Sequence, residues 1–301
     1  MWYIPIVLRI VLINTIFPII LKGKVLQEHF TRRFFLQFFF CAIYACVLAI
    51  FLGQFSFSYT IGVIACIGAV NGLAAYSQWR ANDINLSATS VFAFFDDAIA
   101  ISLGYSILNE SQYFTPNIGI GLIICCAVVM LFTVINYLKM TKKIEGTSYL
   151  PFRFFLHVAT FTIIWGFATF FMRYFALKQV GVGTFILGWY SGACITATGI
   201  FLVKRGFPIK KELSLTVSTS NISLMLVVSV IIMANIWLTF WALQVAPLTV
   251  VKPIFFVSAM VIPALVGLFI FKEKKEYTKK ELVLFLAAFI GAIYIATGYR
   301  G

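Results

Sequence analysis

Two adjacent carboxylates stand inside an apolar stretch of the chain. Residues 90–105 read SVFAFFDDAIAISLGY, with Asp96 and Asp97 in the middle. A charge at the centre of a membrane-spanning helix costs roughly 3 kcal/mol, so such residues mark ion, proton or substrate pathways. The pair therefore predicts a site for a proton or for the cationic group of a substrate. The alternative is a carboxylate that is protonated or salt-bridged and only ties helices together.

Two basic residues also lie inside apolar segments, Arg9 near the beginning of the chain and Lys252 near its end. Each would pair with an aspartate across a cavity, which partly offsets the cost of burying both signs of charge. Alternatively, the two bases bind an anionic group of a substrate. A third reading is that their long side chains extend to the lipid headgroups.

Polar and aromatic residues with ligand-forming groups follow several of the same segments. Asparagine inside a membrane usually joins helices by hydrogen bonds, and Trp and Tyr usually pack or lie at the membrane interface. Asn71 and Asn235 occupy similar places in the two halves of the chain, and Trp165 precedes a glycine that permits close helix approach. The candidate lining residues are Asn14, Asn71, Tyr76, Trp165, Tyr190 and Asn235.

The composition defines the class of protein that must position these residues. The chain has 301 residues, of which 62% are hydrophobic and only 11% are charged, whereas a soluble domain is about half apolar and a quarter charged. The apolar residues form long blocks, so we expect an all-α polytopic membrane protein. Ten spans are predicted: 2–21, 34–52, 60–79, 86–108, 117–138, 154–176, 182–203, 219–243, 247–271 and 281–299.

Basic residues are distributed unevenly between these spans. Nearly all of them fall in the odd-numbered loops, whereas the even-numbered loops hold only Arg173 and Lys178. This bias places the odd loops in the cytoplasm and both termini outside. The net charge of +13 then reflects orientation and contact with anionic lipid, so we expect no nucleic-acid partner. The expected location is the inner (plasma) membrane of a bacterium.

The residues that usually bind metals are few or dispersed. The six cysteines all lie in apolar blocks and show no metal-ligand spacing, and only two histidines are present. We interpret the cysteines as packing residues and expect neither a metal nor another cofactor.

The chain looks internally repeated. Glu110 ends the fourth segment as Glu273 ends the ninth, and Asn14-Thr15 before Lys22 matches Trp165-Gly166 before Arg173. Each half has five segments, so the second half enters the membrane from the opposite face, as in many secondary transporters. The repeats are predicted at 2–138 and 154–299, joined by a cytoplasmic linker at 139–153. Gly121 and Gly291 suggest close packing of the two last helices of the repeats.

These features resemble the drug/metabolite transporter superfamily, of the EamA type. The resemblance rests on Trp165-Gly166, on the run ALQVAPLTVVKPIFFVSAMVIPALVGLFIFKE and on the glutamates Glu110 and Glu273. The first half departs from the family pattern, because its first segment lacks the Trp-Gly pair. The resemblance implies a ten-helix 5+5 inverted repeat, whose fourth and ninth helices line a central cavity.

We therefore expect a secondary transporter that moves a small polar or amphipathic metabolite, such as an amino-acid-like compound, by alternating access. Its partners would be the substrate and membrane lipids, while coupling to protons and assembly as a homodimer stay open. A membrane-embedded enzyme that modifies lipid is the first alternative, and an uncoupled channel or scaffold is the second. The absence of a spaced Asp-rich motif and of a histidine cluster weighs against an enzyme.

Overall fold

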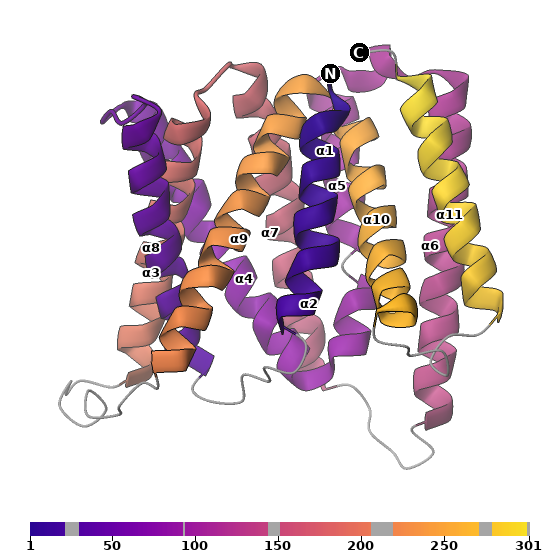
Figure 1. The fold of residues 1–301 in the computed structure, drawn as a ribbon, viewed down its shortest axis with the longest axis horizontal. Coiled ribbons are helices and arrows are strands. Elements are labelled where there is room, and N and C mark those ends of the chain that lie inside the picture. Colours follow the sequence, from indigo (N-terminus) through magenta and orange to yellow (C-terminus); the bar gives the residue numbers. More distant parts are fainter. Residues whose placement is uncertain (22–29, 93, 144–150, 206–218, 271–278, 300–301) are drawn as a thin grey trace.

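The computed structural model describes residues 1–21, 30–92, 94–143, 151–205, 219–270 and 279–299. They form long helices that run side by side (Figure 1). The elements are α1 (Tyr3–Arg9), η1 (Ile10–Ile16), α2 (Phe17–Leu21), α3 (Phe30–Phe51), α4 (Tyr59–Phe92), α5 (Phe94–Ile107), η2 (Glu110–Tyr113), α6 (Pro116–Lys143), α7 (Phe152–Leu177), α8 (Val182–Arg205), α9 (Thr219–Val245), α10 (Leu248–Phe269) and α11 (Lys279–Gly298).

The predicted all-α membrane class is confirmed at the level of individual helices. Among the described residues, six stretches are long and apolar enough to cross a membrane: Tyr3–Ile20, Thr31–Phe51, Tyr59–Ile84, Phe152–Leu177, Val182–Lys204 and Ile222–Val245. Three shorter apolar stretches accompany them, Pro116–Phe132, Leu248–Pro263 and Val283–Gly298. Many large apolar side chains on the outside of the bundle are exposed, including Val47, Ile123 and Ile195, as expected for contact with lipid.

Both chain ends lie at the same end of the helix bundle, which we call the terminal face (Figure 1). Ring contacts hold the two ends together there. Trp2 meets Tyr299 edge to face with ring centroids 5.3 Å apart, and Tyr299 meets Tyr113 of η2 at 6.2 Å. The hydroxyl of Tyr299 donates to the carbonyl of Val245 at 3.3 Å. These contacts connect the chain ends to the α9–α10 turn.

The fourth predicted segment is built differently from the prediction. The expected link RANDIN (residues 80–85) is helical and belongs to α4, which is described to Phe92, while α5 is described from Phe94. Phe92 packs on Phe154 of α7, in the same cluster as Ala74. A straight helix would separate Ala74 from Phe92 by about 27 Å, so α4 bends to keep its last turns against α7.

The first spanning segment, made of α1, η1 and α2 and called the first rod below, is not α-helical throughout. Between α1 and α2, the segment η1 adopts the wider π-helical turn, and Pro18 stands just after it. Proline provides no N–H to the carbonyl four residues earlier, which here belongs to Asn14, and its ring crowds that carbonyl. Wider turns before the proline relieve this conflict, and such turns are frequent at functional sites.

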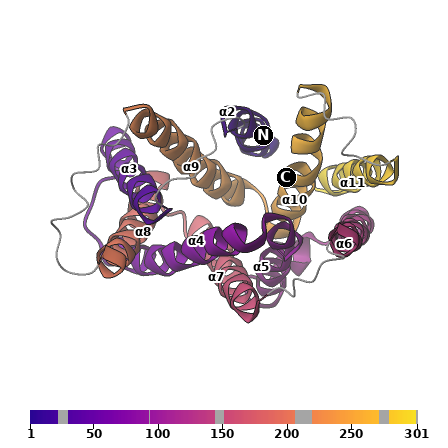
Figure 2. The same cartoon turned by 90° about the horizontal axis from the view of Figure 1, so that it is seen from below.

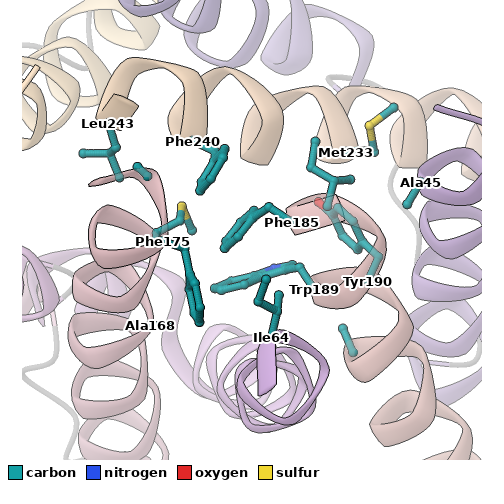
Figure 3. Close-up of a cluster of buried hydrophobic side chains, with 14 of the residues drawn as sticks. Ala45, Ile64, Ala168, Phe175, Phe185, Trp189, Tyr190, Met233, Phe240 and Leu243 are labelled. Carbon is teal, nitrogen blue, oxygen red and sulfur yellow. The ribbon is translucent and has the colours of Figure 1, made fainter. Parts of the chain in front are cut away.

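The largest core packs aromatic side chains between α3, α4, α7, α8 and α9 (Figure 3). Phe185 stacks on Phe240 with centroids 4.0 Å apart and planes inclined by 8°, and Trp189 lies 5.4 Å from Phe185. Offset-stacked rings contribute beyond the area they bury. This core fixes α8 and α9 against the first half of the chain.

Glycine lets α8 and α4 approach at backbone distance. A Cβ added at Gly192 would lie 1.8 Å from the carbonyl oxygen of Ala65, and one added at Gly68 would lie 2.2 Å from that of Trp189. The expected contact between the last helices of the repeats is also present, because Gly121 of α6 faces the backbone of Gly291 in α11. Small residues drive such packing in membranes.

The two halves of the chain interleave instead of forming separate bodies. Figure 2 shows α3 beside α8 at one end of the molecule and α6 beside α11 at the other. Between them, α1 packs on α9, η1 on α10, α5 on α7 and on α10, and α4 on α7 and on α8. Of the expected linker 139–153, the first residues continue α6, and residues 144–150 lie outside the described part.

The α4–α8 contact gives a direct test of the packing. We expect Gly192→Ala to lower the free energy of unfolding by about 1–3 kcal/mol, because the added methyl meets backbone atoms that cannot move aside alone. Gly199→Ala on the same helix is the matched control, since nothing lies within 4 Å of its added Cβ; it should be neutral or stabilising by up to about 1 kcal/mol. Thermal unfolding in detergent measures both. Equal effects of the two substitutions would contradict the arrangement.

Candidate functional site

Asp97 and Lys252 join α5 to α10 inside the bundle. The Lys252 ammonium nitrogen lies 2.5 Å from Oδ1 of Asp97, and the two side chains are 14% and 12% exposed. Of the readings open for Lys252 in the sequence, the structure therefore shows the pair with an aspartate. Each charge offsets the burial of the other, which an isolated charge in an apolar medium cannot achieve.

Arg9 lies beside this pair and is held by two other helices. Its Nε donates to Oδ1 of Asn235 on α9 at 2.8 Å, and its guanidinium carbon lies 3.8 Å from the ring centroid of Phe255 on α10. Asp97 lies within electrostatic reach of the guanidinium. Within the described residues, the buried Nη1 of Arg9 has no hydrogen-bond partner. The side chain is therefore fixed in place with one donor unused.

Asn14 lies in the π-helical segment next to Arg9 and is buried. Its amide nitrogen donates to the hydroxyl of Ser258 on α10 at 3.0 Å, while that hydroxyl donates to the carbonyl of Phe255 at 2.8 Å. The wider turns of η1 thus meet α10 through a polar contact.

We call Arg9, Asp96, Asp97, Asn235 and Lys252 the charged cluster.

The two aspartates lie near the beginning of α5, which is described from Phe94. They were expected in the middle of a span at 86–108. Asp96 and Asp97 are both buried, each with 9% exposure. Asp96 therefore lies next to the ion pair of Asp97 and Lys252.

Gly166 brings α7 against the aspartates. A Cβ added at this glycine would lie 2.6 Å from the side chain of Ile99 and 3.1 Å from the carbonyl oxygen of Asp96. The neighbouring Trp165 packs on Phe161 in another cluster, with ring centroids 5.7 Å apart. The Trp-Gly pair therefore contributes its glycine to the site and its ring to packing.

Three other predicted lining residues have different surroundings. Tyr190 is 1% exposed and donates to the carbonyl of Ile232 at 2.8 Å, within the aromatic core of Figure 3. The hydroxyl of Tyr76 accepts from Nε of Arg80 at 3.1 Å. Asn71 is buried on α4. For Tyr76 and Tyr190, the described contacts favour the packing reading.

A second buried ion pair, which the sequence did not predict, lies nearer the terminal face. Nε of Arg173 on α7 donates to Oε1 of Glu110 at 2.8 Å, and the side chains are only 4% and 1% exposed. Arg173 also donates to the carbonyl of Leu243 on α9, and Glu110 accepts from the backbone N–H of Leu248 at 3.1 Å and of Thr249 at 3.4 Å on α10. We call this group the clasp.

The clasp provides hydrogen-bond partners for the backbone on both sides of the α9–α10 turn. Arg173 supplies a donor to the last turn of α9, whose carbonyls lack intrahelical partners, and Glu110 supplies an acceptor to the first N–H groups of α10. Arg173 was expected in a loop and Glu110 in a helix-ending role, but both are interior. The available signal was their isolation, because charges are rare in the even-numbered loops. Glu273, the matching glutamate of the second half, and Lys22 lie outside the described residues.

Together the fold and the two ion pairs define a class, a helical membrane protein with charges buried between its two halves. No protein-family model matches the chain, and no curated protein matches it. A solved structure titled only "Crystal structure of protein" superposes on it with a TM-score of 0.69 at 12% identity, covering 99% of this chain and 98% of the other. At that identity the likeness concerns the fold alone.

Removing one partner of the clasp should be costly. We expect Glu110→Gln and Arg173→Met each to lower the free energy of unfolding by about 3–5 kcal/mol, because each leaves an uncompensated buried group. The double variant should lose clearly less than the sum of the two, with a coupling of about 0.5–3 kcal/mol. Unfolding titrations in mixed micelles measure the cycle.

A surface pair on α4 provides the matched control. Arg80 and Asp83 are 3.6 Å apart, with side chains 34% and 53% exposed, so Asp83→Asn should change stability by less than about 1 kcal/mol. If Glu110→Gln were as mild as Asp83→Asn, or if the two clasp substitutions were simply additive, the clasp would not stabilise the fold.

Proposed function

We propose that this protein is a secondary transporter of a small polar or amphipathic metabolite, with the charged cluster as its substrate site. The observation that carries the proposal is the meeting of Asp97 and Lys252 between α5 and α10, with Arg9 and Asn235 joining α1 to α9 beside them. Charges within a membrane are expensive, and their presence between movable helices is typical of substrate and ion pathways.

The pattern of helix contacts supports a 5+5 inverted repeat. We match the rod α1–α2 and helices α3, α4, α5 and α6 in order with α7 to α11. Under this matching, the largest contacts between the two halves each have a counterpart. The contact α1·α9 corresponds to α4·α7, η1·α10 to α5·α7, and α3·α9 to α4·α8, while α3·α8, α5·α10 and α6·α11 correspond to themselves. A two-fold relation within the membrane plane generates this pattern.

The arrangement of the chain ends supports ten crossings. Both ends lie at the terminal face, which requires an even number of crossings. The fourth crossing would consist of the last turns of α4 together with α5, and it would contain the two aspartates.

The distribution of basic residues supports the orientation predicted from the sequence. The described basic residues at helix ends away from the terminal face include Arg32, Arg33, Lys142, Lys143, Arg153, Lys204, Arg205, Lys279 and Lys280. The terminal face, by contrast, has the exposed Lys178 and the internally paired Arg173. By the positive-inside rule, the proposed orientation has the terminal face outside the cell. The proposed location is the inner membrane of a bacterium.

The clasp gives the proposed mechanism a closed state. Glu110, Arg173 and the first turn of α10 are joined at the terminal face, and the rings of Trp2, Tyr113 and Tyr299 pack beside them. For a substrate to pass on this side, α10 must separate from Glu110. Substrate binding would shift the balance between closed and open states by its different affinity for each.

Counterflow in liposomes tests the proposal. Vesicles that contain the purified protein are loaded with an unlabelled mixture of amino acids, organic acids and nucleosides, and isotopically labelled members are added outside. We expect at least one labelled compound to accumulate transiently above its outside concentration, with a saturable rate, because a carrier exchanges bound substrate across the membrane. Mass spectrometry of washed vesicles measures the uptake.

The double variant Asp97→Asn with Lys252→Met should abolish this counterflow while folding normally, because it removes both charges of the pair together and leaves neither unpaired. Lys178→Gln, at the exposed end of α7, is the control and should transport as the wild type. Non-saturable flux without counterflow would indicate a channel, and no flux of any compound through folded wild-type protein would refute the transporter.

A further inference from the structure

The two bases of the charged cluster differ in what remains free on them. The ammonium of Lys252 is already matched by Asp97 at 2.5 Å. Arg9 makes one hydrogen bond, from Nε to Asn235, and lies over the ring of Phe255. Its Nη1 is buried and, within the described residues, lacks a hydrogen-bond partner. A sequence that contains both bases does not distinguish them, but these contacts do.

The geometry around Arg9 fits a group that binds anions. A buried N–H without an acceptor is costly, so the position favours an acceptor that arrives from outside the protein. The planar guanidinium presents paired donors that match a carboxylate, and stacking on an aromatic ring is a usual way to fix its plane. Asn235 and Phe255 hold two parts of the group, so little ordering would remain when a ligand binds.

Charge balance narrows the class of anion. The cluster has two bases, Arg9 and Lys252, and two acids, Asp96 and Asp97. Lys252 contacts Asp97 directly, Asp96 is the neighbour of Asp97 on α5, and Arg9 lies over the ring of Phe255, one turn along α10 from Lys252. A dianionic phosphate would add two negative charges next to two carboxylates, whose repulsion is strong where water is scarce. A single carboxylate adds less, and one on a molecule that also has an ammonium group adds no net charge.

We propose that Arg9 is the anion-binding residue of this site, that it binds a carboxylate of a small organic substrate, and that Lys252 is the resident counter-ion of Asp97. The proposal rests on the transporter function above and specifies its substrate class. Asp96, nine-tenths buried and without an ion pair within the described residues, is the acceptor that a substrate ammonium would reach.

Matched ligands test the proposal by thermal stability of the full chain in detergent. Three sets, built on glycine, leucine and phenylalanine, each contain the amino acid, the same acid without its amino group, and the amino acid amide; phenyl phosphate is added as a dianion. A ligand that binds the folded state raises the melting temperature. We expect members with a free carboxylate to raise it by about 2 °C or more at saturating concentration, and the amides and the phosphate to have no effect.

Variants of Arg9 test its role in binding the carboxylate. Arg9→Lys keeps the positive charge and should fold, but loses the paired donors, so carboxylate affinity should fall by about tenfold or more. Arg9→Gln should lose the response entirely. Lys178→Gln, at the exposed end of α7, is the surface control and should keep the full response.

The proposal is overturned if amides stabilise the wild type as well as acids do, if Arg9→Lys and Arg9→Gln bind carboxylates normally, or if no carboxylate in the panel has an effect. Counterflow separates this from the transporter itself. Uptake confined to compounds without a carboxylate would leave the transporter standing and refute the role of Arg9. Binding that depends on Arg9 without any counterflow would do the reverse.

Discussion

The interaction on which the arrangement most depends is the buried pair of Glu110 and Arg173. Neither side chain can be left alone in an apolar bundle, and each supplies what a helix end lacks: a donor for the carbonyl of Leu243 and an acceptor for the N–H groups of Leu248 and Thr249. The pair thereby joins the α5–α6 connection, α7, the end of α9 and the start of α10. One charge pair thus positions four pieces of backbone from both halves of the chain.

The clasp and the charged cluster share helices α9 and α10. Lys252 lies one turn after Leu248 on α10, and Asn235 lies about two turns before Leu243 on α9. Because a helix transmits rotation along its axis, a rotation of α10 at either ion pair would alter the geometry at the other. A ligand that weakens the attraction between Asp97 and Lys252 would therefore also change the hydrogen bonds between Glu110 and the first turn of α10. Coupling of this kind requires only two helices and no long pathway.

The sequence predicted those features that depend on composition. Long apolar blocks suffice to predict helices in a membrane, and charges within them suffice to select Arg9, Asp97 and Lys252, because the energetic cost of each is independent of the fold. The length of α4 was not predictable, since the polar link RANDIN (residues 80–85) is nevertheless helical. Nor was the clasp, because its members are 63 residues apart and each looks like an ordinary charge near a loop. Tyr76 and Tyr190 show the same limit: their hydroxyls have partners that only tertiary packing supplies.

The π-helical segment between Arg9 and Pro18 makes the first rod adjustable in a way that the others are not. Wider turns contain a surplus residue relative to an α-helix, and passing that surplus along the rod advances one side by about 1.5 Å and turns it by about 100° relative to the other. Arg9 stands on one side of the segment, and the proline fixes the other. A change of winding in this segment would thus move the guanidinium of Arg9 away from Asn235 while the other helices kept their hydrogen bonds. The first rod could in this way rotate and shift next to the charged cluster.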